Sequence, residues 1–211
     1  MKKFELTNEF ITNMFGTKLF RIRALVEFGD VEAGELGGYV EKESNLGHDD
    51  NAWVYDNAWV YGNARVYGDA QVSGDARVYD NAWVYGGAQV SGDARVYGNA
   101  RVYGNAWVYG NAWVYGNAWV YGNALVCSDE DYAYAHGFGS VNRTTTFFRL
   151  KDGGVGVRCG CFYGTLAQFR DKIRETHGET KKAQEYLMLA DLMELRFEED
   201  ENEVGNRKYV E

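Results

Sequence analysis

The residues of this chain best suited to chemistry are its histidines and a close pair of cysteines. Cys159 and Cys161 are separated by one residue, a spacing that puts both thiols on one face of a strand, where they and His136 would approach a soft metal ion. Two thiolates and one imidazole do not complete the four-ligand set of a structural zinc site. Of the remaining histidines, His48 lies just before the first full unit of a central repeat and His177 at a predicted helix end, and the sequence shows no paired serine–histidine–acid pattern. We therefore expect no metal site and assign no catalytic residue.

A second polar group follows the most regular part of the chain. A glycine-rich segment, 137–140, precedes an arginine and a run of three threonines. Backbone amides, hydroxyls and a guanidinium are the donors that hold phosphate or carboxylate groups. We predict a site for a small anionic ligand formed by His136, Ser140, Arg143 and Thr145. The alternative is a polar turn that leads into a hairpin.

These residues must be positioned by a repeat that dominates the centre of the chain. Alanine and valine each recur every sixth residue from Ala52 to Val126, in units of the form Ala-x-Val-Tyr-Gly-Asn, where x is usually Trp, Arg or Gln. A helix would scatter these valines around its surface, and one long strand would not accept the recurring Gly-Asn pairs. The repeat therefore predicts short strands joined by turns, with valine inside and x and tyrosine outside.

A longer period shows how the hexads close into coils. The segment 71–79 recurs identically as 89–97, an offset of eighteen residues or three hexads. Three sides per coil predict a triangular parallel β-helix. Residues eighteen apart should then stack, so that arginine and tryptophan form cation–π pairs and the asparagines 63, 81, 99 and 117 form an amide ladder.

The outer faces of these coils are unusually aromatic, and all six tryptophans lie in the repeat. Burial of three valines per coil contributes roughly 1.5–3 kcal/mol each, far below the ordering cost of eighteen residues at about 1.5 kcal/mol each. We therefore predict a homo-oligomer, with a trimer as the preferred form. The expected contact face combines small polar residues with two framing tryptophans: Trp53, Gln71, Ser73, Gln89, Ser91 and Trp107.

The segments on either side of the repeat differ from it in kind. Residues 1–50 predict an N-terminal cap and a first irregular coil: a short helix from Thr7 or Asn8 to Gly16, a strand from Phe20 to Phe28, and an opening coil over 36–46. Residues 51–128 are the β-helix. Residues 129–211 predict a small α+β domain. After a loop over 128–140, it has strands over 144–150 and 155–163, helices over 165–177 and 180–197, and a solvated acidic segment, 198–201.

Composition excludes several classes of function. The chain has 22 basic and 31 acidic residues, a net charge of −9, and no basic segment, which argues against binding of duplex nucleic acid. Its apolar runs are much shorter than the roughly 20 residues that span a bilayer. Three cysteines are an odd number, which favours a reducing compartment. We expect a cytoplasmic protein without a membrane partner.

Most of the chain resembles hexapeptide-repeat proteins encoded by phages and prophages of Gram-positive bacteria, for which no activity is known. The resemblance is carried by the segments 21–25, 34–46, 142–148 and 160–165 and by the Val-Tyr-Gly-Asn-Ala hexads. It implies a left-handed coil, a mainly β fold, and residence in the cytoplasm of a host cell.

The coils also resemble those of hexapeptide-repeat acyltransferases. That family acts on acetyl-CoA with a histidine base in a cleft between trimer subunits and with a loop that interrupts the repeat. Residues 51–128 contain neither a histidine nor an interrupting loop. We therefore expect a non-catalytic, oligomeric binding protein without a cofactor, one that sequesters a host protein or a small anionic, nucleotide-like ligand as an antagonist of host defence. The alternative is an acyltransferase that uses acetyl-CoA.

Overall fold

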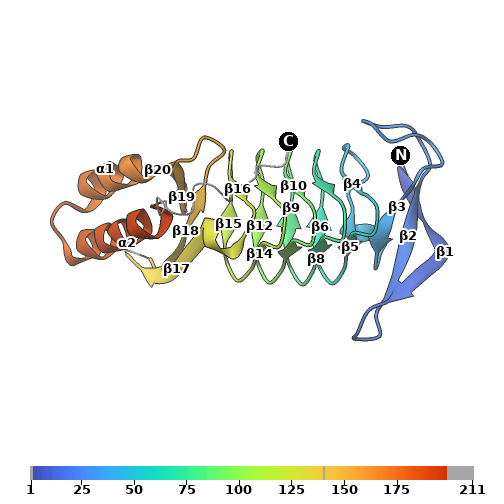
Figure 1. Cartoon of the computed structure of the whole chain (residues 1–211), viewed down its shortest axis with the longest axis horizontal. Helices are drawn as coiled ribbons and strands as arrows, with labels where there is room; N and C mark the ends of the chain where they lie inside the picture. Colours follow the sequence, from blue (N-terminus) through green and yellow to red (C-terminus); the bar gives the residue numbers. More distant parts are fainter. Residues whose placement is uncertain (1, 140, 199–211) are drawn as a thin grey trace.

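The central repeat forms an elongated parallel β-solenoid with three short strands per coil (Figure 1). The computed structural model describes residues 2–139 and 141–198. We call the solenoid the shaft. Its strands β4 to β16 are Trp53–Val54, Trp59–Val60, Arg65–Val66, Gln71–Val72, Arg77–Val78, Trp83–Val84, Gln89–Val90, Arg95–Val96, Arg101–Val102, Trp107–Val108, Trp113–Val114, Trp119–Val120 and Leu125–Val126.

Three sheets run along the shaft, and each pairs strands that are eighteen residues apart. Their orders are β4-β7-β10-β13-β16, β6-β9-β12-β15 and β5-β8-β11-β14, and all of these neighbours are parallel, with Val72 opposite Val90 as one example. Every valine from Val54 to Val126 in the hexad series has 0% exposure. The predicted fold class, the eighteen-residue coil and the inward valines are confirmed, while the hand of the coil stays a prediction.

Glycine at the corners allows consecutive turns to stack closely. Gly68 has a φ of +71°, and a Cβ built there would lie 2.9 Å from the backbone nitrogen of Gly86 in the next coil. Both the left-handed backbone and the close approach disfavour larger residues at this position. The recurring glycine of the hexad is therefore a requirement of coil stacking.

The outward side chains form the columns that the eighteen-residue period predicts. Tyr79 and Tyr97 stack with ring centres 4.9 Å apart, and Arg95 lies 4.6 Å from the ring centre of Trp113. The asparagine ladder is continuous, with hydrogen bonds of 3.1, 3.3 and 3.3 Å from Asn63 through Asn117.

The N-terminal segment is a β-hairpin, so the predicted helix from Thr7 or Asn8 to Gly16 is wrong. Strand β1 (Phe4–Thr12) pairs antiparallel with β2 (Lys18–Ala24), and β2 pairs with β3 (Leu36–Val40), which joins the shaft through β5. The side chain of Asn13 accepts hydrogen bonds from the backbone N–H groups of Phe15 and Thr17, which shapes the hairpin turn. Pairing with β2 outweighs the weak local helix signal.

Strand β2 ends at Ala24, four residues before the predicted end at Phe28, because the chain turns there to contact the N-terminus. The predicted opening coil is present as β3 and a short 3₁₀ helix, Glu43–Asn45. Trp53, expected on the outer surface, has 0% exposure because Phe4 and Phe28 pack edge-on against its indole ring. It is therefore not available for a contact between subunits.

The first coil is closed by side chains that donate to its free carbonyls. Lys3 Nζ donates to the carbonyls of Asp50 and Ala52 at 2.6 and 2.7 Å, and Asn45 Nδ2 donates to those of Gly62 and Ala64 at 3.2 and 2.8 Å. Burial lowers the pKa of Lys3 to about 8. These contacts satisfy backbone groups that have no preceding coil.

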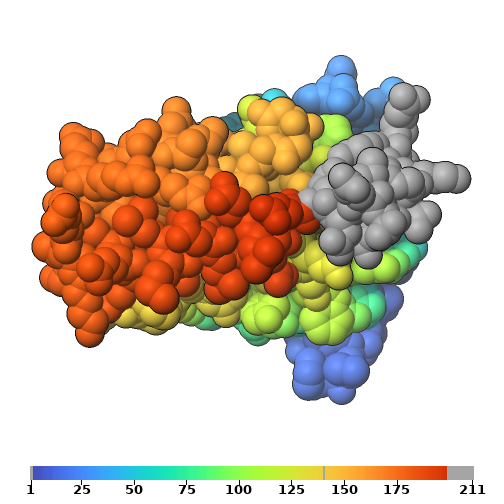
Figure 2. Space-filling model, turned by 60° about the vertical axis from the view of Figure 1, so that its left-hand side comes forward, coloured from blue at the N-terminus to red at the C-terminus, as the bar shows by residue number. Residues whose placement is uncertain are grey.

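The C-terminal segment contains a four-stranded antiparallel sheet and two helices. Strands β17 (Tyr132–Phe138), β18 (Arg143–Arg149), β19 (Val155–Cys159) and β20 (Phe162–Thr165) are paired in chain order, and we call them the C-terminal sheet. Helices α1 (Leu166–His177) and α2 (Lys181–Phe197) follow, with the predicted Thr165–Gln168 capping box and with Thr180 as the second N-cap. Figure 2 shows both helices as the outer surface at this end of the molecule.

Two expectations for this segment are wrong. The loop predicted over 128–140 is strand β17 from Tyr132 to Phe138, because Tyr132–Ala135 pairs with Thr145–Phe148. The predicted single strand over 155–163 is two strands, because Gly160, with a φ of +59°, turns the chain between them. Of the acidic segment 198–201, only Glu198 lies within the described residues, where it is exposed.

This segment also closes the last coil. Trp113 N donates to Asp129 Oδ1 at 2.7 Å, the Tyr132 hydroxyl donates to the carbonyl of Trp113 at 2.6 Å, and Trp119 N donates to Thr146 Oγ1 at 2.9 Å. Asp129 belongs to a second 3₁₀ helix, Asp129–Asp131. The C-terminal sheet is therefore joined to the shaft by specific hydrogen bonds. Among the described residues, no helix has the length and apolar content needed to cross a membrane.

Candidate functional site

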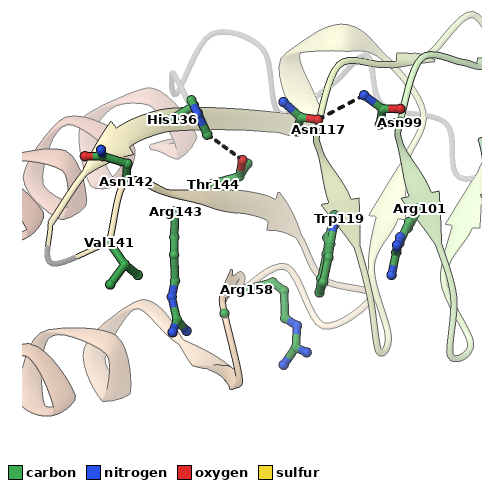
Figure 3. A pocket seen from close by; sticks show the side chains of 11 residues that line it. Asn99, Arg101, Asn117, Trp119, His136, Val141, Asn142, Arg143, Thr144 and Arg158 are labelled. Atoms are coloured by element: carbon green, nitrogen blue, oxygen red, sulfur yellow. Dashed lines mark hydrogen bonds between the residues drawn. The ribbon is translucent and has the colours of Figure 1, made fainter.

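A cavity of about 440 Å³ lies where the last coils of the shaft meet the C-terminal sheet (Figure 3). The shaft contributes four lining residues, which are Asn99, Arg101, Asn117 and Trp119. The C-terminal sheet and its β17–β18 turn contribute the rest, among them His136, Arg143, Thr144 and Arg158. We call this the arginine cavity, since three of the described residues that line it are arginines and none of them is acidic.

Aromatic rings and carbonyls hold two of these arginines in place. Arg101 lies 4.8 Å from the ring centre of Trp83 and 4.9 Å from that of Trp119. Arg158 lies 5.6 Å from the ring centre of Trp119, and its Nη1 donates to the carbonyls of Cys161 and Phe162 at 3.1 and 3.3 Å. Such contacts restrict the side chains while they leave the positive charges uncompensated.

The third arginine, Arg143, extends from the start of β18 and is exposed. Its guanidinium lies against Gly160, where a side chain would overlap it. Within residues 2–139 and 141–198, none of Arg101, Arg143 and Arg158 forms an ion pair. The cavity therefore presents three positive charges without a carboxylate partner from the described part of the chain.

Further polar groups complete the wall. His136 Nδ1 and Thr144 Oγ1 are hydrogen-bonded at 2.9 Å, from neighbouring strands β17 and β18. The asparagine ladder enters the cavity with Asn99 and Asn117. Burial raises the pKa of the nearby Tyr103, although the charge of Arg158 opposes that rise. Tyr103 therefore stays neutral at physiological pH.

The structure brings two of the four predicted ligand-binding residues, His136 and Arg143, into one cavity. Thr145 is excluded because it is 1% exposed and its hydroxyl donates to Cys159 Sγ at 3.1 Å, on the opposite face of β18. Its neighbour Thr144 lines the cavity instead. Ser140 lies outside the described residues.

Sequence reasoning missed Arg101, Trp119 and Arg158 as site residues. The eighteen-residue period already pairs Arg101 with Trp119 in the last coils, so that half of the site could have been found. The contribution of Arg158 depends on how β19 packs against the shaft, for which the sequence has no periodic signal.

The predicted contact face carries a separate hollow of about 560 Å³. Gln89, Ser91 and Trp107 line it, together with Leu125 and Lys151. Lys151 Nζ lies 3.8 Å from the ring centre of Trp107, and burial lowers the pKa of this lysine. Gln71 and Ser73 are half-buried on the same side of the shaft but do not line this hollow.

The surroundings of the two cysteines and of His48 and His177 favour structural roles for these residues. The turn at Gly160 separates Cys159 from Cys161, so the predicted shared strand face is wrong. In the part of the chain that the structure describes, no three His, Cys, Asp or Glu residues are grouped as a metal site. His48 stacks on Phe4 at 4.4 Å, and burial lowers its pKa. His177 stacks on Tyr186 at the end of α1.

Comparison with known proteins identifies only the repeat. The family model described as YdcK Beta solenoid repeat matches six overlapping segments, 58–70, 70–86, 88–104, 94–110, 100–116 and 106–122. A search of curated protein sequences finds no match. The matched segments all lie in the shaft and leave both flanking regions uncovered. The chain is therefore a repeat β-helix protein whose coils are similar to the YdcK β-solenoid repeat.

Proposed function

We propose that this protein is a non-catalytic binding protein that holds a small anionic ligand in the arginine cavity. The observation that carries the proposal is the set of three guanidinium groups, Arg101, Arg143 and Arg158, in one cavity to whose lining the described part of the chain contributes no carboxylate. The whole chain has a net charge of −9, so this cationic cavity departs from the average of the molecule. An anion would provide the missing counter-charge.

Arginine suits this role because its guanidinium is always charged and offers a planar fork of donors to phosphate or carboxylate oxygens. Arg101 and Arg158 are already held by Trp119 and its neighbours, so less side-chain freedom is lost when a ligand binds. The volume of about 440 Å³ is typical of small-molecule sites, which span roughly 300–1,000 Å³.

The same residues give little support to catalysis. Thr144 and His136 form a hydroxyl–imidazole pair, but among the described residues no carboxylate bonds to His136 to fix its tautomer. Retention of the ligand is therefore the function that these residues favour over acyl transfer from acetyl-CoA.

We extend the proposal to the biological setting. The resemblance to hexapeptide-repeat proteins of phages and prophages supports a left-handed coil and residence in the host cytoplasm. The thin valine core and the outward columns of Trp, Tyr and Arg support a homotrimer. A protein that retains a nucleotide-like signal or a host protein, without turning it over, would act as an antagonist of host defence.

Substitution of Arg143 tests the proposed site. We expect Arg143→Ala to weaken binding tenfold or more, about 1.4 kcal/mol, because a fixed charge and its donors are removed. The measurement is calorimetric titration with acetyl-CoA, nucleotides, pyrophosphate and tripolyphosphate, together with light scattering to show an unchanged oligomer. Arg95→Ala is the matched control, since Arg95 stacks on Trp113 on another face of the shaft. Equal affinity in the wild type and Arg143→Ala, or no binding of any of these anions, would reject the proposal.

A further inference from the structure

The three guanidiniums of the arginine cavity are arranged in a row. Figure 3 shows Arg143, Arg158 and Arg101 in that order along the cavity, with the indole ring of Trp119 between Arg158 and Arg101. The distances from the ring centre, 5.6 Å to Arg158 and 4.9 Å to Arg101, fit a ring flanked by two cations. One tetrahedral anion cannot engage two guanidiniums that are separated by an indole ring. An extended anion can contact all three.

Charge leads to the same conclusion about the ligand. A single carboxylate would neutralise one of the three guanidiniums and leave two without a counter-ion among the described residues. Arg158 is half-buried, and its buried Nε has no hydrogen-bond partner among residues 2–139 and 141–198. Unpaired, partly buried cations are unfavourable, so a ligand with several negative charges gains more from this cavity than a monoanion does.

The asparagine ladder adds a directional donor at the edge of the same cavity. Lys42 Nζ contacts Asn63 Oδ1 at 3.5 Å, and each amide nitrogen then donates to the amide oxygen of the next coil. This order leaves the amide nitrogen of Asn117 at the end of the ladder, on the side of His136 in Figure 3. In the region that the structure describes, no acceptor takes a hydrogen bond from this nitrogen. Chains of hydrogen bonds polarise one another, so Asn117 is a strengthened donor.

From these features we propose that the ligand is an oligophosphate, a chain of three or more phosphate groups. The chain lies along Arg143, Arg158 and Arg101, and one of its oxygens accepts a hydrogen bond from Asn117. This inference rests on the proposed function, since it names the class of anion that the arginine cavity holds. Oligophosphate chains occur free and as part of nucleoside polyphosphates, and the two share the chemistry that these residues recognise.

The surroundings of Trp119 indicate that the phosphate chain is recognised, and not an attached base. Both neighbours of this ring are guanidiniums, so no ring face is left for stacking of a nucleobase without displacement of an arginine. A nucleoside triphosphate should therefore bind about as tightly as inorganic tripolyphosphate.

The test compares phosphate, pyrophosphate, tripolyphosphate, ATP and acetate by calorimetry on the full chain, at constant ionic strength and without divalent cations. We expect tripolyphosphate to bind at least 100-fold more tightly than phosphate, and ATP to bind within threefold of tripolyphosphate. Constant ionic strength is needed because salt screens these interactions. Equal affinities for phosphate and tripolyphosphate would overturn the inference while anion binding stands. ATP binding far more tightly than tripolyphosphate would also overturn it, since the base would then be recognised.

Asn117→Asp tests the directional donor. The substitution replaces an amide donor by a negative acceptor, so we expect tripolyphosphate affinity to fall at least tenfold. Asn111→Asp is the matched control, because it adds the same charge at another corner of the coil, outside the cavity lining. Equal losses in the two variants would remove Asn117 from the site. Failure of the wild type to bind every anion would reject the proposed function itself.

Discussion

Inward and outward positions of a coil differ sharply in what they tolerate. Val90 is completely buried within the shaft, whereas Arg95, in the next strand, is half-exposed and stacks on Trp113. The valine contributes through removal of apolar surface from water, and the arginine through a contact that water partly replaces. Single residues of the shaft therefore carry very different shares of its stability.

We expect Val90→Asp to lower the melting temperature much more than Arg95→Ala. A carboxylate in the shaft would be buried without a partner and would cost several kcal/mol, whereas loss of one exposed cation–π contact costs about 0.5–1 kcal/mol. Thermal unfolding followed by circular dichroism measures the difference. Similar melting temperatures for the two variants would show that the inward and outward assignments are incorrect.

At the scale of the element, the turn between β19 and β20 positions a ligand-binding side chain. Gly160 combines a φ of +59° with direct packing against the guanidinium of Arg143. Gly153, in the turn between β18 and β19, has a φ of +84°, but no atom of the described residues lies within 4 Å of the position of a Cβ. Both glycines thus have a positive φ, and they differ in that a Cβ at Gly160 would overlap the guanidinium of Arg143.

Gly160→Ala should weaken tripolyphosphate binding at least fivefold, because its methyl group displaces Arg143 from the arginine cavity. Gly153→Ala is the matched control: we expect both variants to lose about 1–2 kcal/mol of stability from the left-handed backbone, but only Gly160→Ala to lose binding. Calorimetric titration and chemical denaturation separate the two effects. Unchanged binding in Gly160→Ala would show that this turn does not position Arg143.

On the scale of the whole molecule, the shaft is thin for its length and its aromatic residues remain partly exposed. Trp107, Trp113 and Tyr115 are 40%, 39% and 40% exposed. Tryptophan, tyrosine and arginine are the residues that dominate contacts between proteins. These columns are therefore suited to contacts between copies of the shaft.

We expect the protein to be a homotrimer in solution. Light scattering coupled to gel filtration at micromolar concentration should give a mass of about three times the 23.9 kDa of one chain. Exposed aromatic columns would then be covered by the neighbouring subunits, which adds the apolar burial that a single thin core lacks. A mass equal to that of one chain would refute this prediction.

The sequence by itself determined the shaft, because the same residue pattern recurs in every coil along its axis. The eighteen-residue period was sufficient to place Val90 inside, Arg95 on Trp113 and the asparagines in a ladder, because each residue meets the residue at the same position of the next coil. The Thr165–Gln168 capping box was equally predictable, since it depends only on neighbours in the sequence.

Only the tertiary structure decided how the non-repeating segments pack on the two ends of the shaft. Burial of Trp53 follows from its contacts with Phe4 and Phe28, which are distant in sequence. The choice of Thr144 over Thr145 follows from the register of β18, where a shift of one residue moves every side chain to the other face. The approach of Arg158 to Trp119 likewise joins two segments that share no periodicity. Long-range packing therefore completes a site that the repeat only begins.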